Sequence, residues 1–64
     1  MGTVNGTKAD IAGMTVAAYL ASAGYDPARV AVEQNGAIVP KARYDAAVLN
    51  DGDSVEVVSF VGGG

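Results

Sequence analysis

The sequence ends in three consecutive glycines, Gly62, Gly63 and Gly64, which carry the most accessible chemistry of the chain. A glycine buries no side chain, and ordering its backbone costs about 1–2 kcal/mol of conformational entropy. We therefore expect residues 61–64 to form a flexible tail on a folded domain of residues 1–60. Three extended residues reach about 10 Å, and they can enter a channel too narrow for side chains. The sequence thus predicts that Gly62 and Gly63 thread the active site of a partner and deliver the Gly64 carboxylate to it.

The side-chain inventory argues against catalysis by the chain itself. Its 64 residues include no cysteine and no histidine, which excludes disulfides, thiolate metal sites, thiol nucleophiles and histidine-based acid–base catalysis. Asp51 and Asp53 flank a glycine in a turn sequence, and that turn explains both carboxylates without a metal ion. The sequence therefore predicts a protein that is not an enzyme and has no catalytic residues, bound cofactor or metal.

The net charge of −3 is concentrated in the second half of the chain. Residues 1–32 hold two cations and two carboxylates, whereas residues 33–64 hold two cations and five carboxylates. This balance argues against a nucleic-acid partner, which would require a basic surface. It is compatible with docking on a basic protein surface and equally with a role in solubility. No apolar run approaches the roughly 20 residues of a membrane span, and no signal sequence is evident, so we expect a cytoplasmic protein without membrane contact.

A helix is expected near the start of the chain. Thr15 is a suitable N-cap, Gly24 is suited to a left-handed C-cap, and Pro27 prevents the helix from resuming. Between the caps, apolar residues recur with the spacing of one helix face. These residues are Val16, Tyr19, Leu20 and Ala23. A helix of only about nine residues is unstable alone in water, so it must lie across a sheet.

Short strand patterns surround this helix. Asn5-Gly6 and Asn35-Gly36 are strong hairpin signals, because both central residues of a type I′ turn adopt positive φ. The expected strands cover residues 1–4, 7–11, 30–34, 38–39 and 54–61. The first of them is short and weak, because Gly2 lowers its strand propensity. In the connection over residues 41–49, we expect the side chains of Tyr44, Val48 and Leu49 to anchor to the core. This order of elements predicts an α+β fold of the β-grasp type, a mixed four- to five-stranded sheet with one main helix on one face.

The last strand should present two different faces. Val55 and Val57 alternate with Val58 and Phe60, so the second pair predicts an exposed apolar patch beside the tail, which a partner could bind. Ala31 could join the same surface. The alternative is that the helix covers this face and that Phe60 belongs to the core.

The chain resembles the family of small ubiquitin-like sulfur carriers, of the ThiS/MoaD type, and within it the thiamin-biosynthesis branch most closely. The resemblance spans nearly the whole sequence and rests on short motifs at matching spacing. They are Val4-Asn5-Gly6, Gly13-x-Thr15, Val30-Ala31-Val32, Asn35-Gly36, Ile38-Val39-Pro40, Asp51-Gly52-Asp53-x-Val55-Glu56 and Gly63-Gly64. Each motif is weak alone, and their combination is fairly specific.

The resemblance implies a mechanism and partners. An E1-like adenylyltransferase would use ATP and magnesium to adenylate the Gly64 carboxylate, and sulfur from a persulfide donor would then convert it to a thiocarboxylate. Thiazole synthase would receive this sulfur to build the thiazole of thiamin. Alternatives are a sulfur carrier for another pathway, such as molybdopterin or cysteine synthesis, a ubiquitin-like protein modifier, or an interaction module with a passive tail.

Overall fold

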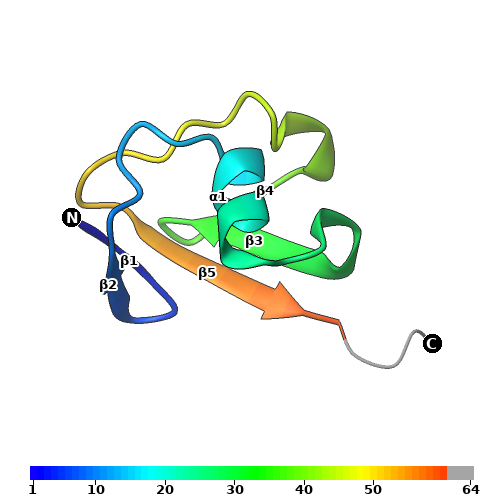
Figure 1. Ribbon diagram of the computed structural model, residues 1–64, viewed down its shortest axis with the longest axis horizontal. Helices are drawn as coiled ribbons and strands as arrows, with labels where there is room; N and C mark the ends of the chain where they lie inside the picture. Colours follow the sequence, from blue (N-terminus) through cyan, green and yellow to red (C-terminus); the bar gives the residue numbers. More distant parts are fainter. Residues whose placement is uncertain (61–64) are drawn as a thin grey trace.

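The computed structural model describes residues 1–60. A mixed five-stranded sheet forms one layer, and a single α-helix lies across one face of it (Figure 1). The strands are β1 (Gly2–Val4), β2 (Thr7–Ala9), β3 (Val30–Gln34), β4 (Ala37–Val39) and β5 (Ser54–Ser59). The helices are α1 (Val16–Ala23) and the single 3-10 turns η1 (Pro27–Arg29) and η2 (Lys41–Arg43). This is the predicted arrangement of one sheet and one main helix.

The last strand of the sequence lies in the middle of the sheet, whose strand order is β2-β1-β5-β3-β4. β5 runs parallel to β1 and antiparallel to β3, and the two remaining pairs are antiparallel hairpins. Because β5 is paired on both sides, its position depends on the rest of the sheet. The segment that leads toward the C-terminal glycines is therefore the central strand of the sheet.

Both predicted Asn-Gly hairpins are confirmed. Asn5 and Gly6 have φ values of 52° and 80°, and Asn35 and Gly36 have values of 53° and 82°. Positive φ at both central positions is the property of a type I′ turn, which matches the twist of the flanking strands. These turns set the registers in which Val4 pairs with Thr7 and Gln34 pairs with Ala37.

The helix also forms where its capping residues predict. The Thr15 hydroxyl accepts a hydrogen bond from the Ala18 backbone N–H (3.1 Å), and Gly24 ends the helix at a φ of 81°. Val16 and Leu20 are fully buried against the sheet. α1 thus closes the apolar core from one side.

Within residues 1–60, no helix is long and apolar enough to cross a membrane.

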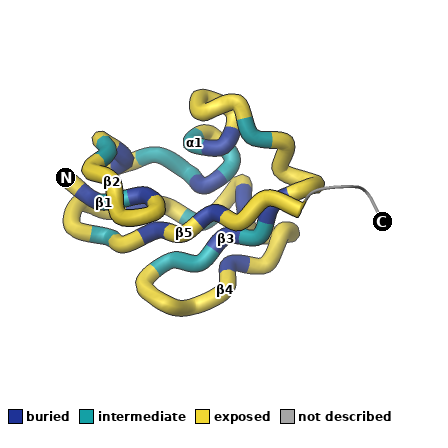
Figure 2. Tube along the Cα trace, turned by 90° about the horizontal axis from the view of Figure 1, so that it is seen from below, coloured by how far each residue is buried: buried dark blue, intermediate teal, exposed yellow. Residues whose placement is uncertain are grey.

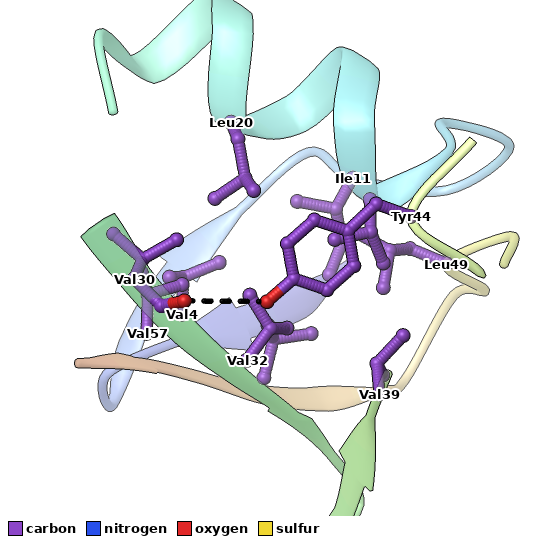
Figure 3. Packing of buried hydrophobic residues seen from close by; sticks show 11 residues of the cluster. Val4, Ile11, Leu20, Val30, Val32, Val39, Tyr44, Leu49 and Val57 are labelled. Atoms are coloured by element: carbon purple, nitrogen blue, oxygen red, sulfur yellow. Dashed lines mark hydrogen bonds between the residues drawn. The ribbon is translucent and has the colours of Figure 1, made fainter. Parts of the chain in front are cut away.

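The core lies between α1 and the inner face of the sheet. Figure 2 marks its buried positions in dark blue, and Figure 3 shows Leu20 and Tyr44 directed toward the valines of β3. The Tyr44 hydroxyl lies 3.4 Å from the Val30 carbonyl oxygen, to which it donates a hydrogen bond. Tyr44 and Leu49 therefore anchor their segment as predicted. The prediction that Val48 does the same is wrong: Val48 pairs with Thr15 in an isolated bridge, and 47% of its surface is exposed.

Two features of the first hairpin differ from expectation. Gly2 was expected only to weaken the first strand, but its position requires a glycine. A Cβ there would lie 2.6 Å from Cδ1 of Ile11 and 2.7 Å from the backbone oxygen of Asp53. The second strand was expected to extend to Ile11, but β2 ends at Ala9 and Ile11 turns fully into the core. The missing side chain of Gly2 provides the space that Ile11 fills.

Candidate functional site

The candidate site begins where β5 leaves the sheet. Ser59 pairs with Val30, and the Phe60 backbone N–H donates a 2.8 Å hydrogen bond to the Arg29 carbonyl, so the chain is anchored up to Phe60. The predicted flexible tail lies outside the described residues, as do the predicted roles of Gly62, Gly63 and Gly64. These roles stay predictions, whereas the surface from which the tail segment departs can be described in detail.

An exposed apolar strip crosses the sheet face opposite α1. Val58 and Phe60 are 55% and 57% exposed, which confirms the predicted exposure and rules out a core position for Phe60. Ala31 pairs directly with Val58, and directly paired residues project from the same face of a sheet. Ala31 therefore lies on the same face as Val58, where it is half-buried. We call Ala31, Val58 and Phe60, together with Ile38 of β4, the apolar strip.

Ile38 is the member of the strip that the sequence interpretation missed. It is 74% exposed, the highest value among the large hydrophobic residues in the described chain. Alternation along the strand could have indicated this exposure, because Val39 is buried and adjacent strand residues point to opposite faces. The register then decides the position, because Ile38 pairs with Glu33 on the outer face of β3.

Lys41 holds three segments together at the point where β5 ends. Its Nζ donates hydrogen bonds to the carbonyl oxygens of Ala28 (2.8 Å) and Pro27 (3.3 Å). The same nitrogen lies 6.0 Å from the centroid of the Phe60 ring, at the outer limit of a cation–π contact. Lys41 therefore links η1 and η2 to the aromatic end of the apolar strip. These segments are distant in sequence, so no local pattern could have indicated the contact.

The Asn5 side chain supports the site from the other side of β5. Its Oδ1 accepts a 2.8 Å hydrogen bond from the Val57 N–H, and its Nδ2 donates a 3.2 Å hydrogen bond to the Val57 carbonyl. The amide thus replaces a backbone peptide and continues the parallel pairing of β1 and β5 by one step. It fixes the strand directly before Val58.

A polar cluster closes the opposite end of the sheet. The Asp53 carboxylate accepts hydrogen bonds from the side chains of Gln34 (2.7 Å) and Asn35 (2.9 Å) and from the Asn50 N–H (2.8 Å). These bonds, that of Asn35 foremost, hold the pKa of Asp53 below its usual value. Asp51 instead pairs with the amino group of Met1, which donates a hydrogen bond to it and lowers its pKa. The turn alone therefore does not account for the two carboxylates: Asp53 joins it to the β3–β4 hairpin, and Asp51 joins it to the N-terminus.

A shallow groove of about 430 Å³ lies along the free edge of β4. Gln34 and Arg43 are the residues with polar side chains that line it, and Arg43 is the single ionisable one among them. One guanidinium without a nucleophile or a general base cannot perform group-transfer chemistry. Within residues 1–60, no group of three or more histidine, cysteine, aspartate or glutamate residues could hold a metal ion.

A central strand that carries an exposed apolar strip toward a glycine-rich C-terminal segment defines a ubiquitin-like protein of the β-grasp class. More specifically, the chain belongs to the ThiS family, whose family model matches residues 3–64. The family resemblance deduced from the short motifs is thereby confirmed.

Individual relatives agree with this assignment. The chain is 44% identical over 50 residues to the sulfur carrier protein ThiS of Bacillus subtilis, covering 78% of this chain and 76% of that protein. The crystal structure of a thiamine biosynthesis protein (ThiS) from Geobacter metallireducens superposes with a TM-score of 0.78 at 36% identity. The match covers 97% of this chain and 96% of that chain, and it confirms the β-grasp fold.

A different kind of relative is a thiazole synthase from Paramagnetospirillum magneticum. It is 48% identical over 62 residues, which cover 95% of this chain and 19% of that protein. The chain therefore spans about a fifth of the length of that enzyme. A thiazole synthase from Magnetococcus marinus matches in the same way, with 47% identity over 53 residues and 16% of its length covered.

Proposed function

We propose that this chain is the sulfur carrier protein of thiamin biosynthesis. The observation that carries the proposal is the match to the ThiS family, which extends through the three glycines to residue 64. In the proposed cycle, an E1-like enzyme adenylates the Gly64 carboxylate, sulfur replaces the adenylate, and the resulting thiocarboxylate donates its sulfur to thiazole synthase. Gly62 and Gly63 thread the active sites of the partners.

The chemistry of the first step requires a partner. A carboxylate is a poor electrophile, and its negative charge is repelled by the α-phosphate of ATP that it must attack. Magnesium and preorganised cations in the partner's site overcome this repulsion and stabilise the charge that develops. ATP and magnesium therefore belong to the adenylating partner, and the chain acts as substrate and carrier.

The sulfur step also places the reactive group on the C-terminus. A protein without cysteine cannot hold sulfur as a persulfide on its own side chain. The sulfur must come from a separate persulfide donor, whose terminal sulfur displaces AMP from the activated carboxyl group to give an acyl disulfide. A thiol then attacks the donor sulfur, forms a disulfide with it and releases the thiocarboxylate on Gly64. This exchange, like the adenylation, takes place in a cytoplasmic complex in which the chain is not the catalyst.

Thiazole synthase is the proposed acceptor for a specific reason. Two thiazole synthases contain a segment similar to this chain within one longer polypeptide. Joining two domains raises their effective concentration, which benefits a pair that must exchange a group. The apolar strip of Ala31, Ile38, Val58 and Phe60 is the proposed contact surface for this pairing.

Mass spectrometry of the intact protein tests the proposal. The chain is incubated with ATP, magnesium, a persulfide donor, a thiol reductant and the E1-like enzyme encoded by the same genome. Exchange of one oxygen for sulfur at Gly64 is expected, and omission of ATP should abolish it. Conjugates to lysines of other proteins would instead indicate a protein modifier, and an unchanged mass would contradict both functions.

The receiving pathway is tested by adding thiazole synthase and its small-molecule substrates to the thiocarboxylate form. We expect a thiazole product and return of the carrier to its original mass. Transfer only to molybdopterin or cysteine synthesis enzymes would contradict the thiamin assignment. Matched controls are chains that lack Gly64 or carry one residue after it, which should fold normally and accept no sulfur.

A further inference from the structure

Two glutamates face each other on the exposed side of the sheet. Glu33 of β3 and Glu56 of β5 are directly paired in the antiparallel register, two residues along each strand from the Ala31–Val58 pair of the apolar strip. Glu33 is also paired with Ile38 on its other side. Among the described residues, neither glutamate forms an ion pair with a cation. The strip is therefore bordered by two uncompensated carboxylates.

This pairing is unfavourable in the isolated protein. Like charges directly opposite each other destabilise a sheet, whereas opposite charges or neutral pairs at the same positions stabilise it. Covering the pair with an apolar surface would raise the cost further, because both charges would lose water without gaining a partner. Any protein that binds the whole strip must therefore supply a positive charge at this position.

The charge pattern also excludes two other occupants of this face. A second copy of the chain, placed face to face, would bring four carboxylates together. A nucleic acid would add phosphate charges to an already acidic surface. A protein surface that combines apolar area with a cation is the occupant that the face fits.

The opposite end of the strip carries the opposite charge. Lys41 lies against Phe60, which follows Glu56 by four residues, or about 13 Å along the strand. Along β5 toward the C-terminus, the exposed face thus presents first the carboxylate pair, then Val58, and then the Phe60 ring beside the Lys41 cation. Apolar contact alone has no preferred direction, whereas charges at its two ends fix orientation and register.

We propose that Glu33 and Glu56 together receive an arginine of the adenylating partner and thereby orient the carrier so that its C-terminal segment points into the activating site. A guanidinium suits this position, because it is planar, always charged and offers five N–H donors to two carboxylates. The inference rests on the proposed function, for which it specifies the chemistry of the partner's surface.

The test compares two variants of equal charge. E33Q/E56Q removes the paired carboxylates and keeps their shape, whereas D10N/D45N removes two exposed carboxylates from connecting segments outside the sheet. Binding to the E1-like enzyme is measured by surface plasmon resonance at low and high ionic strength. We expect E33Q/E56Q to bind about ten-fold more weakly or worse, which is the scale of a lost charge-assisted contact. D10N/D45N should show only the small change due to net charge.

Adenylation kinetics of the same variants provide the second measurement. An orientation defect predicts a lower turnover for E33Q/E56Q even when the enzyme is saturated, while its thermal unfolding midpoint stays at or above that of the wild type. Equal binding and turnover for the two double variants would overturn the inference. If the wild-type chain binds but is never adenylated, the proposed function fails, and the binding comparison still decides whether the carboxylate pair meets a cation.

Discussion

Replacing Asn5 with alanine should destabilise the domain strongly for a residue in an exposed turn. The variant loses both hydrogen bonds to Val57, each with a net value of about 1 kcal/mol. Val57 is buried, so its N–H and carbonyl would be left with poor access to water. In addition, Asn5 has a φ of 52°, and a left-handed backbone costs alanine about 1–2 kcal/mol. Together these terms predict a loss of about 3 kcal/mol in the free energy of unfolding.

Urea and thermal unfolding followed by circular dichroism measure this loss. For a domain of this size, 1 kcal/mol corresponds to about 4–8 °C, so the midpoint should fall by about 10–20 °C. Asn5→Gly serves as the control, because glycine accepts positive φ and loses only the hydrogen bonds. Its midpoint should lie between those of the wild type and Asn5→Ala. An Asn5→Ala midpoint within 2–3 °C of the wild type, on the order of 0.5 kcal/mol, would refute the reasoning.

Three further predictions concern the core, the docking face and the pH dependence. Gly2→Ala should lower the free energy of unfolding by about 1–3 kcal/mol, because the added methyl group meets Ile11 and a backbone oxygen. Gly6→Ala is the comparison variant: its Cβ would meet nothing within 4 Å, so its cost comes from positive φ and not from a steric clash. Phe60→Ala should weaken binding to the adenylating partner about 30-fold, which is the scale of an interface hot spot. The free energy of unfolding should change little, because the ring is largely exposed. Equal affinities of the variant and the wild type in a titration would show that Phe60 is not part of the interface. The pKa of Asp53 is lower in the folded state than in the unfolded state. The Asp53 carboxylate therefore stabilises the fold at a pH above its unfolded pKa, and this stabilisation is lost as the pH falls through its folded pKa. Thermal midpoints measured from pH 5 downward should therefore fall less steeply in Asp53→Asn than in the wild type, and parallel curves would contradict this assignment.

Local features were predictable wherever neighbouring residues determine the backbone. The Asn-Gly hairpins formed because both turns require positive φ, and α1 formed between Thr15 and Gly24 because each satisfies the backbone groups at one helix end. The alternation along β5 correctly predicted that Val55 and Val57 are buried and that the strand exposes Val58. In each case the deciding contacts lie within a few residues.

Features that depend on packing were missed or misjudged. Gly2 was considered a weakness of the first strand, since its contact with Ile11 exists only after the hairpin closes over the core. Val48 was expected to be buried, and its pairing with Thr15 turns it outward. A sequence pattern shows that a residue is apolar, but it does not show what space the distant segments leave for it.

The sequence by itself determined the type of chemistry available to this protein. The absence of cysteine and histidine and the run of glycines led to the prediction that the chain presents a carboxylate for activation by a partner. Only the tertiary structure decided which charged residues lie beside the apolar strip. The register of β3 and β5 places Glu33 opposite Glu56, and folding brings Lys41 to Phe60. Such pairings join residues far apart in the chain, and they arise only because burying the valines on the inner face of the sheet selects one alignment of the strands.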